Sequence, residues 1–445
     1  MKNSKYLYAN ICIAATGGLL FGLNMAGIAG ANDLIRNEFN LSATSLGTVA
    51  ALLTIGCLIG ALFTGKFAER YGRKPVMKII SLLYIISSLG CSFANSASLL
   101  AVFRILSGLA VGATSVVIPM YISEISPAKK RGQLVSMNQF AITIGILLAY
   151  VADYLLIGLG DDSWRYMLGV PAIFGLLFFI LLLTSFPESP RWLLASGKEN
   201  EAKKILLKLA GKATVEKELP EMKNSIELDR NKSKASFSEL FKGKTGKVVL
   251  IGCLIASFQQ ITGINAIIIY APDIFQSAGS MQSDSLIQSI LVGVINFLMT
   301  IVAIWLVDRK GRKTLLLWGA AGMILSLGFL SYQFASGALN NLAIMISLLL
   351  YISFFAASFA PVVWVVISEI YPGRIKEMAM SLSTAVVWLC SFLTVQFAPV
   401  IKDQLGLGWL FGIFAFFSVL SYIFVKFFIP ETKGKTLEQI EIELR

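Results

Sequence analysis

A group of uncharged polar side chains interrupts one of the long apolar stretches of this sequence. Gln259, Gln260 and Asn265 lie in a segment that is otherwise apolar enough to cross a bilayer. A buried amide without a hydrogen-bond partner is costly in such surroundings. Gly263, beside the β-branched Thr262, weakens the helix here, and an unwound turn at membrane depth is tolerated where it lines a cavity or packs on protein. Neutral donors and acceptors at such a break indicate a site for a neutral, hydroxyl-rich ligand.

The composition of the chain is that of a protein embedded in a membrane. Of its 445 residues, 56% are hydrophobic and only 14% are charged, and the mean hydropathy is +0.74. Soluble proteins carry about 25% charged residues. The apolar runs are long and do not alternate in segments of about ten residues, which excludes a transmembrane β-barrel. We therefore expect an all-α protein whose main partner is the lipid bilayer.

The apolar runs predict about twelve transmembrane helices, because each span needs about 20 apolar residues. Lys2 and Lys5 precede the first run as in a signal peptide, but the run is too long and lacks a small-residue cleavage site, so we interpret it as the first span. The expected spans are residues 8–30, 45–66, 76–95, 98–120, 132–155, 166–186, 247–274, 284–307, 313–335, 342–368, 376–401 and 406–429.

The net charge of +12 gathers in alternate loops. In a soluble protein such a charge would suggest a nucleic-acid partner, but here topology explains it better, and we expect no nucleic acid. By the positive-inside rule, both termini and the long middle loop are predicted to be cytoplasmic, in a multi-pass protein of the plasma (inner) membrane. The basic loops are residues 66–78, 129–131, 309–313 and 374–376, and the bare or acidic ones are 95–98, 158–162, 273–285 and 336–341.

The residue types argue against an enzyme. The chain has no His, which removes His-bound zinc, a His general base and a His proton relay. No nucleophile–base pair stands out, and we expect neither a metal nor another cofactor. The cysteines all lie in apolar spans and are interpreted as small packing residues rather than disulfides: Cys12, Cys57, Cys91, Cys253 and Cys390.

An internal repeat with an offset of about 240 residues organises the chain. It predicts two parallel halves of six spans each, related by a pseudo-two-fold axis along the membrane normal, with the ligand between them. We expect halves at 1–186 and 247–430, a cytoplasmic linker at 187–246 with amphipathic helices near 198–209 and 217–230, and a cytoplasmic tail at 431–445; a disordered linker is the alternative. The repeated pairs are 69–74 with 308–313, 123–127 with 368–372, and 187–189 with 430–432.

These motifs resemble the sugar porter family of the major facilitator superfamily. The resemblance covers nearly the whole chain and rests on the runs PESPRWL at 187–193, QQITGINA at 259–266 and PETKG at 430–434. It implies the twelve-helix fold of that superfamily and transport of a small neutral sugar by alternating access, by a protein that functions as a monomer.

The resemblance also assigns a sugar site. Amides grip several hydroxyls at once, and an indole offers a flat apolar face to a pyranose. Pro361 lacks an N–H and should break or kink the tenth span before the Trp of this site. The alternative for any single amide is that it ties helices together. The implied contacts are Gln139, Gln259, Gln260, Asn265 and Trp364, with Phe21 and Trp388 lining the cavity and Tyr270 as an outer gate.

Charged residues at the helix ends are implied to form two clusters that hold the inner side shut. A few charge pairs can bias a two-state equilibrium, although a lone charge of this kind is by default a solvated loop residue. Lys376-Glu377 replaces the family's Arg-Gly, and since Lys cannot fork onto a carboxylate we expect the second latch to be looser. The latch residues are Arg73, Glu124, Arg131, Glu188, Arg312, Glu369, Lys376 and Glu431.

The first span decides how transport is coupled. Proton-coupled members of the family read Phe-Gly-Tyr-Asp there, with the Asp facing the Arg of the fourth span, whereas this chain ends the motif with Asn24. Asn takes up no proton, which leaves Arg104 without its carboxylate, as in the passive glucose facilitators. A titratable acid is the minimum for proton coupling. Asp33 and Asp153 are the nearest other acids, and both are interpreted as helix-end or loop residues.

A hexose uniporter is therefore the leading hypothesis. A proton–sugar symporter with a displaced acid is the alternative within the fold, and a membrane sugar sensor is the alternative of another class. The identity of the sugar stays open, because Val387 and Ser391 stand where many relatives carry amides.

Overall fold

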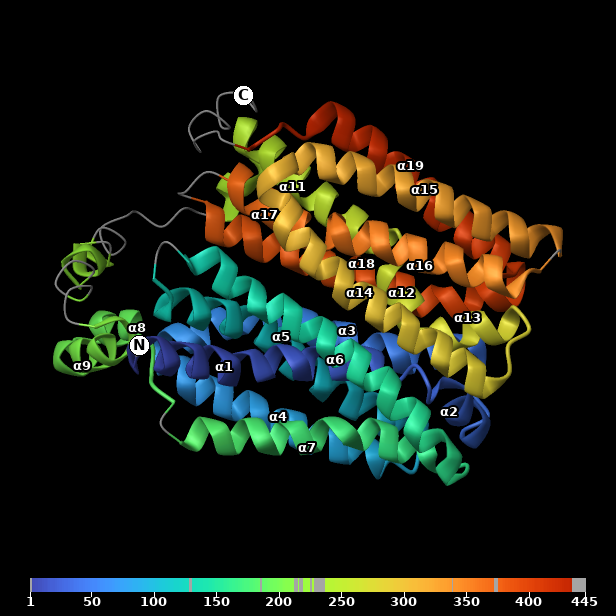
Figure 1. Cartoon of the computed structure of the whole chain (residues 1–445), viewed down its shortest axis with the longest axis horizontal. Coiled ribbons are helices and arrows are strands. Elements are labelled where there is room, and N and C mark those ends of the chain that lie inside the picture. Colours follow the sequence, from blue (N-terminus) through green and yellow to red (C-terminus); the bar gives the residue numbers. More distant parts are fainter. Residues whose placement is uncertain are drawn as a thin grey trace.

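The chain folds into long helices that run roughly parallel to one another (Figure 1). This computed structural model describes residues 2–127, 130–184, 186–211, 215, 219–224, 226–227, 237–337, 339–371 and 375–433. Its helices supply 12 candidate membrane spans, which confirms the predicted architecture. The unbroken spans are α1 (Lys2–Ala26), α3 (Ala43–Tyr71), α4 (Arg73–Ser92), α5 (Ala97–Ile125), α6 (Arg131–Leu156), α7 (Ser163–Leu183), α14 (Gln282–Lys310), α15 (Arg312–Ser336), α18 (Lys376–Leu405) and α19 (Leu407–Phe428).

The first span ends earlier than predicted. We expected it to reach residue 30, but α1 ends at Ala26, and residues 27–31 turn into the short helix α2 (Asn32–Glu38). The turn is held by a side chain from elsewhere in the sequence, because the Gly30 N–H donates to Asp153 Oδ2 over 2.8 Å. The apolar run alone could not reveal this contact.

The seventh span is broken at the predicted position. Helix α11 (Gly243–Ile261) ends just before Gly263, and α12 (Ile264–Ile269) and α13 (Ala271–Ser277) follow. Gly263 has φ +99°, in the left-handed region, and the ring of Phe414 fills the space that a Cβ would need. Only glycine meets both conditions without strain.

The tenth span also breaks, as Pro361 predicts. Helix α16 (Asn341–Ala357) and helix α17 (Phe359–Ile370) are separated by the single residue Ser358. Pro361 is the third residue of α17, where a backbone N–H would have no partner inside the helix. The proline therefore favours a new helix start and opposes continuation of α16.

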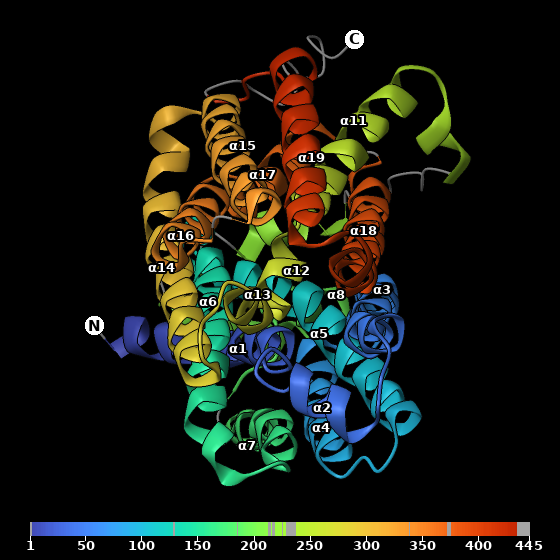
Figure 2. The ribbon, with the colours of Figure 1, turned by 90° about the vertical axis from the view of Figure 1, so that its right-hand side faces the viewer.

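The helices form two bundles. One contains α1–α7 and the other α11–α19, drawn blue to green and yellow-green to red in Figures 1 and 2. The bundles meet chiefly where α3 packs against α18 and where α6 packs against α14. This is the arrangement of two six-helix halves that the internal repeat predicts.

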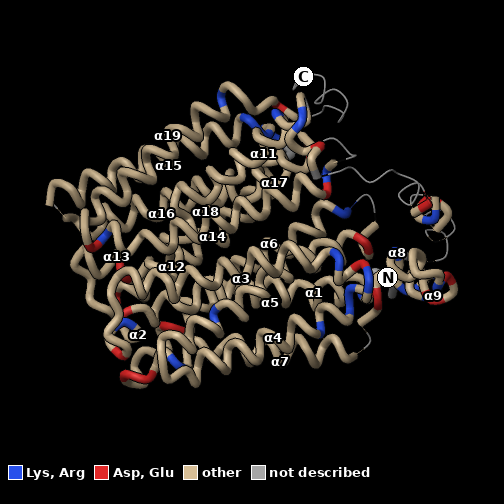
Figure 3. The backbone as a smooth tube through the Cα atoms, turned by 180° about the vertical axis from the view of Figure 1, so that it is seen from behind, with Lys and Arg blue, Asp and Glu red and all other residues tan. Residues whose placement is uncertain are grey.

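The two ends of the molecule differ in charge. The start of α1 and the end of α19 lie at one end, with the linker helices α8 (Pro190–Ala195) and α9 (Glu199–Ala210); we call this the terminal end (Figure 1). The opposite end carries α2 and α13 and is called the loop end. Lys and Arg are concentrated at the terminal end, and the middle of the molecule is nearly free of charge (Figure 3).

Apart from Lys198, the linker residues that were expected to be helical are helical where the structure describes them. Helix α9 covers the predicted 198–209 segment, and residues 219–224 and 226–227 of the predicted 217–230 segment are helical. The short 3₁₀ helix η3 (Phe237–Phe241) leads into α11. Residues 212–214, 216–218, 225 and 228–236 of the linker and the tail from residue 434 lie outside the described residues.

Candidate functional site

The predicted amides of the seventh span form a hydrogen-bonded group at the helix break. Asn265 on α12 donates through Nδ2 to Gln260 Oε1 and to Ser391 Oγ of α18, each over 2.8 Å. Gln260 Nε2 lies 3.5 Å from Gln259 Oε1. The group thus joins α11, α12 and α18 through side chains that remain able to bind hydroxyls.

Gln259 also ties two broken spans together. Its Nε2 donates to the main-chain oxygens of Phe359 and Ala360, over 3.0 and 3.3 Å. The amide is 4% exposed, so these bonds satisfy a donor that would otherwise be buried without a partner. The helix-tying role considered for a single amide therefore applies to Gln259, while Asn265 and Gln260 bond to other polar side chains.

A main-chain carbonyl at the helix break accepts a hydrogen bond from a buried tyrosine. Tyr351 on α16 donates its hydroxyl to the carbonyl oxygen of Thr262 over 3.0 Å. Non-helical backbone at membrane depth needs such a partner. Its position in α16 gave no indication of this role in the sequence.

Aromatic side chains from both bundles meet near the amides. The rings of Phe21 on α1 and Trp388 on α18 lie 6.0 Å apart at an angle of 42°. Trp388 lies one turn before Ser391 on the same helix, which places this pair beside the Asn265 group. The two residues predicted to line the cavity, Phe21 and Trp388, are therefore neighbours, and each bundle contributes one of them.

Gln139 and Trp364 take no part in these contacts. Both are half-buried, and neither side chain has a hydrogen-bond partner in the described part of the chain. Trp364 lies one helical turn after Ala360, whose carbonyl binds Gln259, so it shares a face with that contact. An amide and an indole N–H are thus left available.

Arg104 is fully inside the N-terminal bundle and lacks an acidic partner. It is 2% exposed, and its Nη1 donates to the Asn24 carbonyl oxygen over 3.2 Å. Nη2 lies 3.5 Å from the Ala50 carbonyl. Among the described residues, no carboxylate forms an ion pair with it and its Nε has no partner. The adjoining cavity, about 10 Å³, holds at most about one water.

Asp153 is buried, which its place near a helix end did not suggest. It lies in the last turn of α6, is 1% exposed, and accepts from Gly30 while its Oδ1 has no partner among the described side chains and backbone. Its burial depends on the turn after α1, so the local sequence carries no signal for it.

At the terminal end each bundle holds an Arg–Glu pair. Arg73 makes two bonds to Glu124, Nε–Oε2 at 2.8 Å and Nη2–Oε1 at 2.6 Å. In the second bundle Arg312 Nη2 reaches Glu369 Oε1 at 3.2 Å. The first pair is also more buried, with side chains 9% and 8% exposed against 15% and 25%. A forked, buried pair is the stronger of the two.

The other latch carboxylates bind helix N-termini instead of arginine side chains. Glu188 accepts from the main-chain N–H of Arg73 at 2.9 Å and of Lys74 at 3.1 Å. Glu431 accepts from Arg312 and Lys313 in the same way, at 2.9 and 3.1 Å. These amides open α4 and α15, so the two acids cap helices, where the helix dipole favours negative charge.

The two capping acids differ in proton affinity. Burial raises the pKa of the Glu188 carboxyl despite its bonds from Ser189, Arg73 and Lys74. Burial acts in the same direction on Glu431, but its main-chain hydrogen bonds outweigh it and lower the pKa. Glu431 is therefore the more firmly ionised cap.

The last two predicted latch residues make no ion pair. Arg131 and Lys376 are the first residues of α6 and α18. Within the described ranges neither is joined to Glu124 or Glu369. The expected participation of these two cations in the clusters is not seen among the described contacts, where Glu124 pairs with Arg73 and Glu369 with Arg312.

Hydrogen bonds between the bundles gather at the loop end. Asn32 Nδ2 donates to the Ile269 carbonyl at 2.9 Å, and Tyr150 donates to the Ile268 carbonyl at 2.7 Å. Gln396 Nε2 reaches Thr44 O and Thr48 Oγ1, both at 3.1 Å. These residues were not singled out from the sequence, since each is a single polar residue with its partner far away in the chain.

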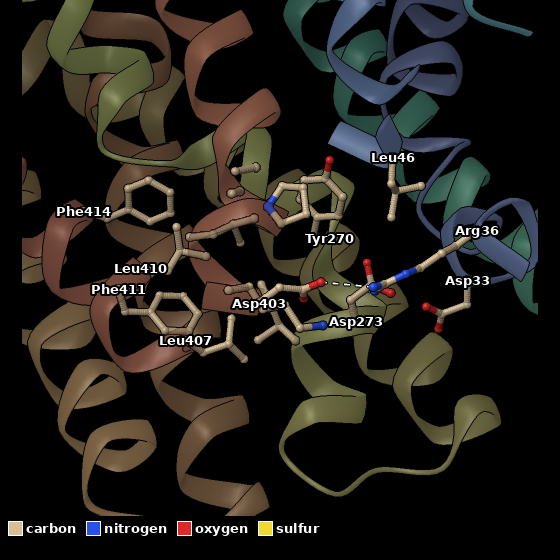
Figure 4. Close-up of a pocket in the computed structure, with 16 residues that line it drawn as sticks. Asp33, Arg36, Leu46, Tyr270, Asp273, Asp403, Leu407, Leu410, Phe411 and Phe414 are labelled. Carbon is tan, nitrogen blue, oxygen red and sulfur yellow. Dashed lines mark hydrogen bonds and ion pairs between the residues drawn. The ribbon is translucent and has the colours of Figure 1, made fainter. Parts of the chain in front are cut away.

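Tyr270 lies between α12 and α13, near the loop end. It is 6% exposed and donates to the Val395 carbonyl of α18 at 3.1 Å. Figure 4 shows it in a pocket with the Arg36–Asp403 ion pair, whose Nη2–Oδ2 distance is 3.0 Å. The pocket has a volume of about 30 Å³, room for about two waters and not for a sugar. The loop end is therefore closed.

Comparisons with known proteins agree with this architecture. Residues 10–444 match the family model described as "Sugar (and other) transporter". The glucose transporter GlcP of Staphylococcus epidermidis is 38% identical over 449 residues, covering 100% of this chain and 98% of the relative. The D-xylose-proton symporter of Escherichia coli K12 is 37% identical over 477 residues, covering 99% and 96%.

Solved structures of a xylose transporter also match this chain over nearly its whole length. The partially occluded inward open conformation of the xylose transporter XylE from E. coli matches with a TM-score of 0.87 at 35% identity, covering 97% of this chain and 100% of that one. The same proton:xylose symporter bound to 6-bromo-6-deoxy-D-glucose matches with a TM-score of 0.82 at 35% identity, covering 100% of both chains.

Proposed function

This chain belongs to the sugar transporter family of the major facilitator superfamily, and we propose that it is a hexose uniporter that works by facilitated diffusion. As a member it is a multi-pass integral membrane protein that transports a sugar and is not an enzyme. Beyond family membership, the proposal covers the coupling mechanism, the sugar contacts and the orientation in the membrane.

Uniport rests on the surroundings of Arg104. The guanidinium binds main-chain oxygens of Asn24 and Ala50, and in the described part of the chain no carboxylate accompanies it. A symporter needs a group that gains and loses a proton during the cycle, and Asn24 supplies none. The relatives include a proton symporter, so symport by another acid is the alternative, with the buried Asp153 as its best candidate.

The sugar is proposed to bind between the bundles, beside the Asn265 group. Gln260, Asn265 and Gln259 supply donors and acceptors, while Trp388 and Phe21 present apolar ring faces. Gln139 and Trp364, whose side chains have no hydrogen-bond partner among the described residues, would complete the contacts from the other sides. Ser391 takes part as well, since its hydroxyl accepts from Asn265; a hydroxyl therefore stands where many relatives place an amide.

Access alternates between the two ends. The pairing of the bundles at the loop end and the TM-score of 0.87 with the partially occluded inward open conformation of the xylose transporter favour an inward-facing state here. We propose that the terminal end is cytoplasmic, as its excess of Lys and Arg favours (Figure 3), and that the protein acts as a monomer in the plasma membrane. Residues 1–186 and 247–430 would be the moving halves, residues 187–246 a cytoplasmic linker and residues 431–445 a cytoplasmic tail.

Reconstitution into liposomes tests the proposal. Entry of radiolabelled glucose, xylose and fructose is followed with and without an inward proton gradient. A uniporter brings the sugar to equal concentrations whatever the gradient. Accumulation above the outside concentration that a proton carrier abolishes would establish a symporter instead, and Asp153→Asn would then be the first variant to examine.

A further inference from the structure

Two carboxyl groups from the two bundles meet at the closed loop end. Asp33 lies on α2 and Asp273 on α13, and their side chains are within hydrogen-bonding reach of each other. Both line the pocket of Figure 4. Asp273 is 8% exposed, whereas Asp33 is half-buried and reached by solvent. Two carboxylates this close in a poorly hydrated place are costly to keep ionised together.

A buried amide beside the pair lacks a hydrogen-bond donor. Asn32 is fully buried; its Nδ2 donates to Ile269 and lies 3.5 Å from Asp273 Oδ2. Its Oδ1 has no partner among the described residues. A carboxylate cannot donate to that oxygen, but a protonated carboxyl group can donate a hydrogen bond.

The cations nearby do not neutralise the pair. Arg36 directs its guanidinium to Asp403, which leaves Lys402 as the cation that acts on Asp273. Its charge and the Asn32 amide lower the pKa of Asp273, but burial and the Asp33 carboxyl outweigh them and raise the pKa to about 8.

The other ionisable groups on the elements packed against the pair are engaged or exposed. Tyr270 and Tyr351 donate to the Val395 and Thr262 carbonyls. Arg165 on α7 pairs with Asp162 and Glu38, and Asp284, in the first turn of α14, is exposed. None of these groups supplies a positive charge or a hydrogen bond that would compensate the negative charges of Asp33 and Asp273.

We propose that Asp33 and Asp273 together bind one proton when the loop end is closed, and that opening of this end releases it. The proton sits on a carboxyl oxygen of the pair and is returned to water as the bundles separate. The inference rests on the proposed alternating access. Since uptake and release both occur through the half-buried Asp33 on the loop-end side, the proton does not cross the membrane and uniport is retained.

The direction of the pH effect follows from the linkage. In the closed state the pKa of Asp273 is about 8, and in a water-filled opening it should fall toward the ordinary value of about 4. Because the pKa of Asp273 is higher in the closed state than in the open state, protonation stabilises the closed state. This stabilisation is complete at pH values below the open-state pKa of about 4 and is lost as the pH rises through about 8. Between these limits the closed-to-open ratio falls about tenfold per pH unit.

Electron–electron distance measurements test this directly. Spin labels are placed at Asn37→Cys and Met281→Cys, exposed positions at the loop end on opposite bundles, in protein whose native cysteines have been replaced. Distances are recorded in lipid nanodiscs without sugar from about pH 6 to about pH 8.5. We expect the long-distance population to grow with pH, toward the tenfold-per-unit limit.

Two variants assign the effect to the pair. Asp273→Asn removes the titrating group and should give a distance distribution that no longer changes between about pH 6 and about pH 8.5. Asp33→Asn leaves Asp273 buried but takes away the neighbouring carboxyl, so the pH response should move to lower pH. The second variant serves if the first fails to fold. Asp284→Asn, the matched change at an exposed position of the same end, should keep the wild-type response.

The proposal is wrong if the wild-type distances do not respond to pH, if the response persists in Asp273→Asn, or if Asp33→Asn leaves the response unchanged. Sugar accumulation driven by a proton gradient would overturn uniport without altering these distances. The two failures are therefore distinguishable.

Discussion

Arg104 binds the main chain of Asn24 and not its side chain. Its Nη1 donates to the Asn24 carbonyl oxygen at 3.2 Å, while the Asn24 amide donates to the Leu20 carbonyl one turn earlier at 2.9 Å. The side chain at position 24 therefore lies beside a buried cation without neutralising it. This relationship makes position 24 a sensitive place to introduce an acid.

Asn24→Asp should make sugar exchange depend on pH. A carboxylate next to Arg104 would be stabilised as an ion pair, and its protonation would cost that pairing. Because the ion pair lowers the pKa of the new carboxyl below its ordinary value of about 4, counterflow of glucose in liposomes, measured from about pH 3.5 to about pH 7, should show a titration at the acidic end that the wild type lacks. Asn24→Ser, which removes the amide without adding an acid, is the control. An unchanged pH profile in the Asp variant would count against position 24 as the coupling position.

Asn265→Ala should weaken sugar binding. It removes the side chain that joins Gln260 to Ser391 and, by proposal, contacts the sugar. Losing such hydrogen bonds costs about 1–3 kcal/mol, or roughly a 5- to 150-fold higher Kd. Calorimetric titration with glucose measures it. Gln288→Ala, at a hydrogen-bonded amide near Ser280 and Asn341, should bind as the wild type does; equal losses in both variants would indicate general destabilisation.

Glu124→Gln should destabilise the protein more than Glu369→Gln. The first removes the charge from a buried, forked pair, and leaving one buried ion alone costs about 3 kcal/mol. The second breaks a longer, more exposed pair worth about 1 kcal/mol. Thermal unfolding in detergent compares them, with Glu38→Gln at an exposed pair as the reference. Equal shifts in Tm for the two latch variants would contradict the asymmetry.

Gly263→Ala should impair both stability and transport. An alanine in the left-handed region costs about 1–2 kcal/mol, and its Cβ would have to displace the Phe414 ring. Unfolding and glucose entry are measured together. Gly132→Ala, at a helical position with nothing near the added Cβ, is the control. A Gly263 variant that folds and transports normally would show that the break tolerates a side chain.

The sequence by itself determined the twelve spans, the breaks at Gly263 and near Pro361, and the charge difference between the two ends. Each depends on local properties: the length of an apolar run, the backbone freedom of glycine, the missing N–H of proline, and the side of the membrane to which successive loops return. The sugar site was likewise indicated by amides placed where apolar residues are the rule.

Only the tertiary structure decided which groups meet. Glu188 and Glu431 cap α4 and α15 instead of pairing with arginine side chains. Asp153 is buried under the turn that follows α1, and Asp33 meets Asp273 across the closed loop end. The partners in these contacts are separated by more than a hundred residues, so their distances depend on how the helices and the two bundles pack, which no local pattern of residue types encodes.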